Sequence, residues 1–147
     1  MKRRDFLKNS ILSAAALSVM GIKNTFATTE KTESETAPYD LAIVRGGEPD
    51  VMFDKAIEAL GGMGKFVKAG QKVVVKPNIG WDVPVERAGN THPKLVSRII
   101  YHCKKAGASE VVVFDNSCDE WTKTYVTSGI QKAVTDAGGK IIPGNKK

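Results

Sequence analysis

Val73-Val74-Val75-Lys76-Pro77-Asn78-Ile79-Gly80-Trp81 is the stretch of sequence that decides the fold. Three consecutive β-branched residues, preceded by the turn-like Ala69-Gly70-Gln71, predict a buried strand of a parallel sheet. Pro77 ends this strand because proline has no amide hydrogen and keeps Lys76 extended. In an open parallel sheet, ligands bind beyond the carboxyl ends of the strands. The stretch therefore predicts a strand and a candidate site that follows it.

Strands and helices alternate on either side of that stretch. Periodicity and capping residues predict strands at residues 39–44, 73–75, 110–114 and 140–142, and helices at residues 50–60, 93–106 and 130–137. This alternation predicts an α/β fold with an open, mostly parallel sheet, right-handed crossovers and helices on both faces. The sequence ends at Lys147, soon after the fourth strand. We therefore expect a domain that is incomplete at its carboxyl end, or a protein partner at the last strand.

The first 27 residues are typical of an export signal. A charged start is followed by an apolar run at residues 11–20, which is too short to span a bilayer of about 30 Å, and by a small-residue cleavage site after Ala27. Four residues look like a bacterial twin-arginine signal: Arg3, Arg4, Phe6 and Leu7. An uncleaved amphipathic anchor is the alternative. We expect a signal peptide at 1–27, a flexible leader at 28–38 and an α/β domain at 39–147. The twin-arginine translocation machinery would export this domain to the periplasm or otherwise across the bacterial cytoplasmic membrane.

The distribution of charge argues against nucleic-acid binding. The chain has a formal net charge of +6, but five basic residues and one acidic residue among the first 27 supply most of it. The remaining sequence has an ordinary balance of charges and no basic stripe interleaved with aromatic residues. We therefore expect no nucleic-acid partner.

Polar residues follow both central strands. The candidates are Lys76 and Asn78 after the first of these strands, and Asp115, Asn116 and Ser117 after the next one. Because parallel strands end at the same edge of a sheet, we expect the two sets to lie close together. A lysine binds phosphate or carboxylate groups, and grouped oxygen ligands bind cations. Solvated or turn-capping roles remain the alternative for every one of these residues.

Thr91 and His92 stand where the second helix is expected to begin, just before Pro93. The amides of a helix start bind anions, and an imidazole serves as a metal ligand or as an acid–base group. Both residues are therefore candidates for ligand binding, and His92 with Asp115 is a candidate for metal binding. Capping of the helix is the alternative for both. His102 lies off the apolar stripe of this helix, so we expect a surface residue there.

The two cysteines predict little chemistry by themselves. Cys103 lies on the apolar stripe and is expected to be buried and inert, whereas Cys118 lies in a loop. An oxidising compartment permits a disulfide between them, but a helix interior and a loop need not come within bonding distance. Both states stay open.

Four pieces of the sequence resemble the domain-of-unknown-function 362 family: residues 66–78, 90–93, 113–116 and 128–130. The Lys-Pro-Asn loop is the most characteristic of them. The similarity covers about residues 39–147 and only the amino-terminal part of the family's domain, which implies a fragment of a longer α/β protein. The resemblance also implies an uncertain activity, with iron–sulfur clusters in some relatives. This chain lacks a four-cysteine set for such a cluster, so its cofactor stays unknown.

Together these features lead to one hypothesis and two alternatives. The hypothesis is an exported protein whose strand-end loops bind a small anionic ligand or a metal in a redox or iron–sulfur-related process. The alternatives are a non-catalytic binding or assembly module, and a fragment without independent activity. Whether the protein is an enzyme, and on which substrate, stays open.

Overall fold

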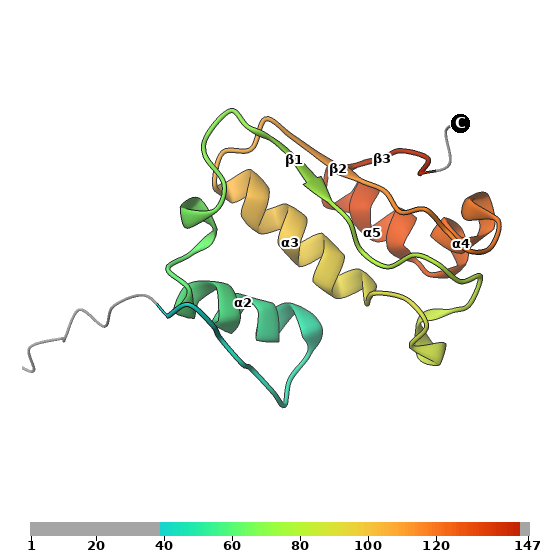
Figure 1. Ribbon diagram of the computed structural model, residues 1–147, viewed down its shortest axis with the longest axis horizontal. Coiled ribbons are helices and arrows are strands. Elements are labelled where there is room, and N and C mark those ends of the chain that lie inside the picture. Colours follow the sequence, from blue (N-terminus) through green and yellow to red (C-terminus); the bar gives the residue numbers. More distant parts are fainter. Residues whose placement is uncertain (1–38, 145–147) are drawn as a thin grey trace, which may run out of the picture. The chain divides into compact units, whose positions relative to one another are not determined.

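A computed structural model of the chain describes residues 39–144 (Figure 1). A parallel sheet with the order β1-β2-β3 forms from Lys72–Val75 (β1), Glu110–Val113 (β2) and Lys140–Ile141 (β3). The predicted α/β fold with an open parallel sheet is confirmed. The predicted signal peptide, its cleavage after Ala27 and the leader lie outside the described residues.

Helices and short 3-10 turns connect and flank these strands: α2 (Pro49–Ala59), η1 (Met63–Lys65), η2 (Val85–Arg87), α3 (Pro93–Lys105), α4 (Trp121–Thr127) and α5 (Ile130–Asp136). The short helix α4 is an addition to the elements predicted from the sequence. Over residues 39–144, no helix has the length and apolar character needed to cross a membrane.

The hydrophobic core lies between the sheet and the two helices α3 and α5. The connections through α3 and α5 cross the sheet in the same direction, so right-handed crossovers place both helices on one face. Seven fully buried residues form the centre: Val96, Ile100 and Cys103 of α3, Val111 and Val113 of β2, and Ile130 and Val134 of α5. Burial of each large apolar side chain contributes about 1.5–3 kcal/mol.

The opposite face of the sheet is open in the described part of the chain. Val74 pairs in register with Val112 on this face and is 61% exposed. Glu110, on the same face, pairs with Lys72 at 3.6 Å and also with Lys140. Helices were expected on both faces, but α3 and α5 share one face and α2 packs against α3. The open face therefore combines apolar and basic side chains.

The predicted strand at residues 39–44 does not form. The segment has a bend at Asp40 and no regular structure from Leu41 to Val44, and it belongs to no sheet over residues 39–144. A local alternation of apolar residues predicts an extended backbone, whereas a strand also needs a neighbour with which to exchange hydrogen bonds. Within residues 39–144 no strand pairs with this segment, so the prediction of a strand was wrong.

The helix boundaries follow from their caps. The nitrogen Nδ1 of His92 accepts a hydrogen bond from the amide of Lys94 at 3.2 Å, and Pro93 occupies the first turn of α3. Of the two predicted caps, His92 is therefore the one used. Gly107 ends the helix with a φ of +92° and lies so close to Ala69 that a Cβ atom would stand 3.0 Å from the Cβ of Ala69. Only glycine fits there without strain.

Candidate functional site

The carboxyl ends of β1 and β2 bring Lys76 and Asp115 together. The register pairs Val75 with Val113, so the residues that follow the two strands emerge at one edge of the sheet. The ammonium nitrogen of Lys76 lies 2.6 Å from Oδ1 of Asp115. The lysine side chain is 61% exposed, whereas the aspartate side chain is 6% exposed. A buried carboxylate thus holds a solvent-facing ammonium group.

Backbone amides complete the surroundings of Asp115. Its Oδ2 accepts a hydrogen bond from the amide of Ile79 at 2.7 Å, and its Oδ1 accepts one from the amide of Asn116 at 2.9 Å. Burial raises the pKa of Asp115, but Lys76 and these amides outweigh burial and lower the pKa below its ordinary value. The carboxylate is therefore charged at neutral pH and ties the loop after β1 to the end of β2.

Tyr125 of α4 holds the backbone of Asp115 in place. Its hydroxyl accepts a hydrogen bond from the amide of Asp115 at 2.7 Å and donates one to the carbonyl of Asp115 at 2.9 Å. Burial raises the pKa of Tyr125, so the hydroxyl keeps its proton. Sequence reasoning missed this residue, because it lies ten positions after Asp115 in a helix that the pattern did not predict.

Asn78 and Thr91 are hydrogen-bonded to each other. The amide of Asn78 donates to Oγ1 of Thr91 at 2.8 Å, and the amide of Thr91 donates to the carbonyl of Asn78 at 2.8 Å. The side-chain amide of Asn78 also donates to the carbonyl of Gly89 at 2.9 Å. These bonds join the loop after β1 to the segment before α3.

The remaining candidates divide between structural and exposed positions. The hydroxyl of Ser117 donates to the carbonyl of Ile79 at 2.6 Å and accepts a hydrogen bond from Thr124 at 3.1 Å. Asn116 is exposed at the same edge as Lys76. His92 caps α3 through its Nδ1. Across residues 39–144, no group of three His, Cys, Asp or Glu side chains is placed to hold a metal ion.

The two cysteines are not bonded to each other. Cys103 is buried in the core, and burial raises the pKa of its thiol. Cys118 is exposed, and its amide donates to the carbonyl of Gly80 in the loop after β1. With one thiol in the core and one in a loop, these residues do not fit a four-cysteine iron–sulfur cluster.

A second charged cluster joins α2 to α3. Arg98 donates to both carboxylate oxygens of Asp54, at 2.6 and 2.7 Å, and Nε2 of His102 lies 2.7 Å from Oδ1 of the same carboxylate. Hydrogen bonds from Arg98 and His102 lower the pKa of Asp54 to about 2. The predicted surface role of His102 is wrong, since its side chain is 16% exposed. The four-residue spacing of Arg98 and His102, which puts both on one helix face, was the available signal.

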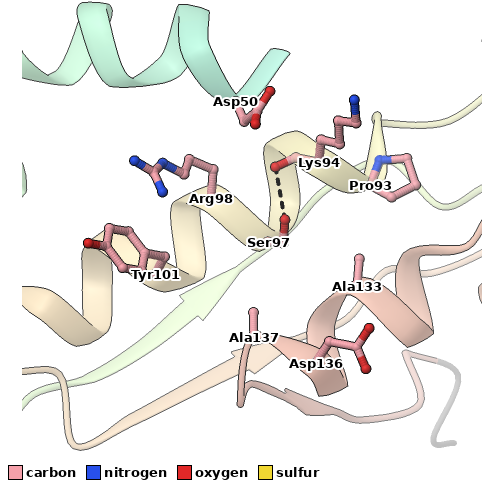
Figure 2. Close-up of a pocket in the computed structure, with 9 residues that line it drawn as sticks. All are labelled: Asp50, Pro93, Lys94, Ser97, Arg98, Tyr101, Ala133, Asp136 and Ala137. Atoms are coloured by element: carbon pink, nitrogen blue, oxygen red, sulfur yellow. Dashed lines mark hydrogen bonds between the residues drawn. The ribbon is translucent and has the colours of Figure 1, made fainter. Parts of the chain in front are cut away.

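A cavity of about 550 Å³ borders the amino-terminal half of α3 (Figure 2). It is lined from α2, α3 and α5, and none of the strand-end candidates contributes to it. Figure 2 shows Lys94 and Arg98 turned away from α5, and their partners are Glu48 and Asp54. Oδ1 of Asp50 is buried without a hydrogen-bond partner among the described residues. The basic side chains of this cavity are thus already engaged within the protein.

One of three comparisons with known proteins gives a match. The family described as Domain of unknown function (DUF362) matches residues 73–147, a range that begins in β1 and includes both Lys76 and Asp115. The comparisons with curated proteins and with solved structures find no match. The matched range is half of the chain, and the chain therefore belongs to the DUF362 family.

Proposed function

We propose that this DUF362 protein is exported and binds a small anionic ligand at the strand-end loops, with Lys76 as the contacting group. The observation that supports the proposal is the ion pair in which a buried Asp115 holds an exposed ammonium group at the shared edge of β1 and β2. An ammonium group has three hydrogens to donate, and Asp115 takes one of them. The other two hydrogens are available to a ligand, because the lysine side chain is largely exposed.

Electrostatics also favours an anion over a metal at this edge. Besides Lys76, two backbone amides point their N–H dipoles at the carboxylate of Asp115 and add positive potential at this edge. A cation would have to displace these donors from the carboxylate. In this proposal Asp115 positions Lys76, and Asn78 and Thr91 fix the loop from which Lys76 projects.

A titration of the full chain with inorganic phosphate, followed by amide NMR shifts, tests the binding proposal. We expect the amides of Ile79 and Asn116 to shift in a saturable way, and Lys76→Met to weaken the binding at least tenfold. Lys72→Met is the matched control, since Lys72 is the exposed lysine at the other end of β1. Equal affinity of the Lys76→Met variant and the wild type would contradict the assignment, as would an equal loss in the control.

The export proposal rests on the paired arginines and needs its own test. Replacing Arg3 and Arg4 by lysine keeps the charge of the signal, and we expect the protein to remain in the cytoplasm of the bacterial host. Cell fractionation followed by intact-mass measurement reports both the location and cleavage after Ala27. Unchanged export of the lysine variant would rule out the twin-arginine route. A redox or iron–sulfur-related role rests on the family resemblance alone.

A non-catalytic assembly module is the second candidate function. The observation that favours it is apolar exposure at the last strand, where β3 is an edge strand and the adjacent Ile142 is 42% exposed. We expect Ile142→Lys to remove a stoichiometric partner from the purified protein, with Val51→Lys on α2 as the exposed control. Turnover of a small substrate by the purified chain alone would instead favour an enzyme.

A further inference from the structure

The segment of residues 39–44 bends at Asp40 and then runs from Leu41 to Val44 with one exposed face and with backbone groups that are unpaired among the described residues. Leu41 and Ile43 are 73% and 77% exposed, whereas the alternate residues Ala42 and Val44 are partly buried toward α2. No backbone hydrogen bond joins residues 40–45 to another described residue. Such an edge, rich in apolar side chains, is a template for pairing with another strand.

β1 offers an edge of the same kind. In the order β1-β2-β3, β1 pairs with β2 on one side, and its other side is free over the described part of the chain. Val74 is exposed on the open face of the sheet, and the side chain of Lys72 is 77% exposed beside it. All-parallel sheets are almost always covered on both faces, so an uncovered Val74 indicates a missing layer.

One parallel alignment of the two edges matches both charge and side-chain size. The alignment sets Asp40 beside Lys72, so that an acid meets a base. It sets Leu41 beside Val73 and Ile43 beside Val75, which places the two large exposed side chains on the core face of the sheet. It sets the smaller Ala42 beside Val74 on the open face. Because Ala42 packs toward α2, the same alignment carries α2 over the open face. Leu41 and Ile43 of one chain and Val74 of the other are then buried by the same contact.

This alignment fits a second copy of the chain and not the chain itself. Within one chain, the connection from residues 39–44 through α2 to β1 would cross the sheet in the same direction as the α3 and α5 connections. A right-handed crossover would then put α2 on the face of α3 and α5, whereas the alignment needs α2 on the open face. The bonds of Asp54 to Arg98 and His102 also keep α2 on its own α3.

We propose that Tyr39–Val44 of one copy adds as a fourth parallel strand to the free edge of β1 in a second copy. The two surfaces are different patches of the same molecule, so the contact is head-to-tail rather than isologous. The assemblies therefore become longer as the protein concentration rises, unless the rotation between copies closes a ring. Asp40 and Lys72 set the register of the added strand.

Mixed crosslinking tests the proposal directly. Two full-length chains with tags of different length carry Ala42→Cys and Val74→Cys respectively, each with Cys118→Ser so that the exposed native thiol is absent. We expect oxidation of the mixture to give a disulfide-linked heterodimer of the two tagged chains. A chain with Val126→Cys in place of Ala42→Cys controls for random collision, since Val126 is 63% exposed on α4.

The double variant Ala42→Cys/Val74→Cys distinguishes a second copy from the same chain. A disulfide that forms within a monomer would place the segment beside its own β1 and would overturn the proposal. Absence of the heterodimer, together with a monomer in sedimentation velocity at every concentration, would overturn it as well.

A charge exchange tests the register. We expect Asp40→Lys to raise the concentration at which half of the chain is associated by at least tenfold, because it sets two cations side by side. Lys72→Asp in the same chain should restore the association by reversing the pair. If neither change alters the concentration at which half of the chain is associated, the alignment is contradicted.

Discussion

Two carboxylates, Asp115 and Asp54, accept the strongest networks of hydrogen bonds in the described part of the chain, and they differ in what they hold. The side chain of Asp115 is 6% exposed, and its donors are two backbone amides and Lys76. The side chain of Asp54 is 34% exposed, and its donors are the side chains of Arg98 and His102. Asp115 therefore fixes the path of a loop, whereas Asp54 fixes how one helix lies on another.

The largest effect that we expect is that of Asp115→Ala. This change leaves the amides of Ile79 and Asn116 without an acceptor at a buried position, and it releases Lys76. We expect the free energy of unfolding to fall by about 3 kcal/mol, measured by urea denaturation. Asp119→Ala is the control, because Asp119 is an exposed acceptor for a backbone amide in the same loop. A loss of less than about 1 kcal/mol for Asp115→Ala would remove the proposed difference between the two carboxylates.

Asp54→Ala should have a smaller effect. The bidentate bond with Arg98 is well formed but partly exposed to solvent, so we expect a loss of about 1 kcal/mol in the same denaturation experiment. Asp136→Ala, which breaks an exposed pair with Lys132, is the control and should cost less. Amide hydrogen exchange should show faster opening of α2 and an unchanged strand-end loop. Faster exchange at Ile79 would instead show that the two networks are coupled.

Acid should abolish the effect of Asp54→Ala. The pKa of Asp54 lies at about 2 in the folded chain against an ordinary value of 3.8, so the carboxylate stabilises the fold above the ordinary value. This contribution is lost as the pH falls through the folded pKa. We therefore expect the stability difference between wild type and Asp54→Ala to be constant above about pH 5 and to shrink towards pH 2. The same sign applies to Asp115, whose pKa is also lowered. A difference that grows on acidification would contradict both assignments.

The smallest expected effect belongs to His92. This residue lies beside the strand-end loops, but its hydrogen bond serves the start of α3. We expect His92→Ala to cost about 0.5–1 kcal/mol, as for the loss of other helix caps, and His92→Ser to restore most of that stability. Phosphate affinity, measured by the NMR titration, should stay unchanged. A large loss of affinity would move His92 from the cap to the ligand site.

The residues that could be predicted are those whose position follows from a single local rule. Lys76 and Asp115 each follow a run of valines, and parallel strands end at one edge, so their meeting was predictable. The position of Tyr125 was not predictable, because the short helix that carries it has no clear periodic pattern. The alternation at residues 39–44 predicted a strand that does not form, because no local pattern reports whether a neighbouring strand is present.

The chain after β3 returns to the candidate site at Gly144. A Cβ atom built on Gly144 would overlap the carbonyl group of Asp115 and would stand 2.9 Å from the amide of Asn116. The backbone at Gly144 therefore occupies space that no side chain could share. In a screen of random variants, Gly144 would score as an essential position of the binding site, although it has no group with which to touch a ligand. A map of mutational sensitivity would thus include residues such as Gly144, which pack against the backbone of Asp115 and do not contact the ligand.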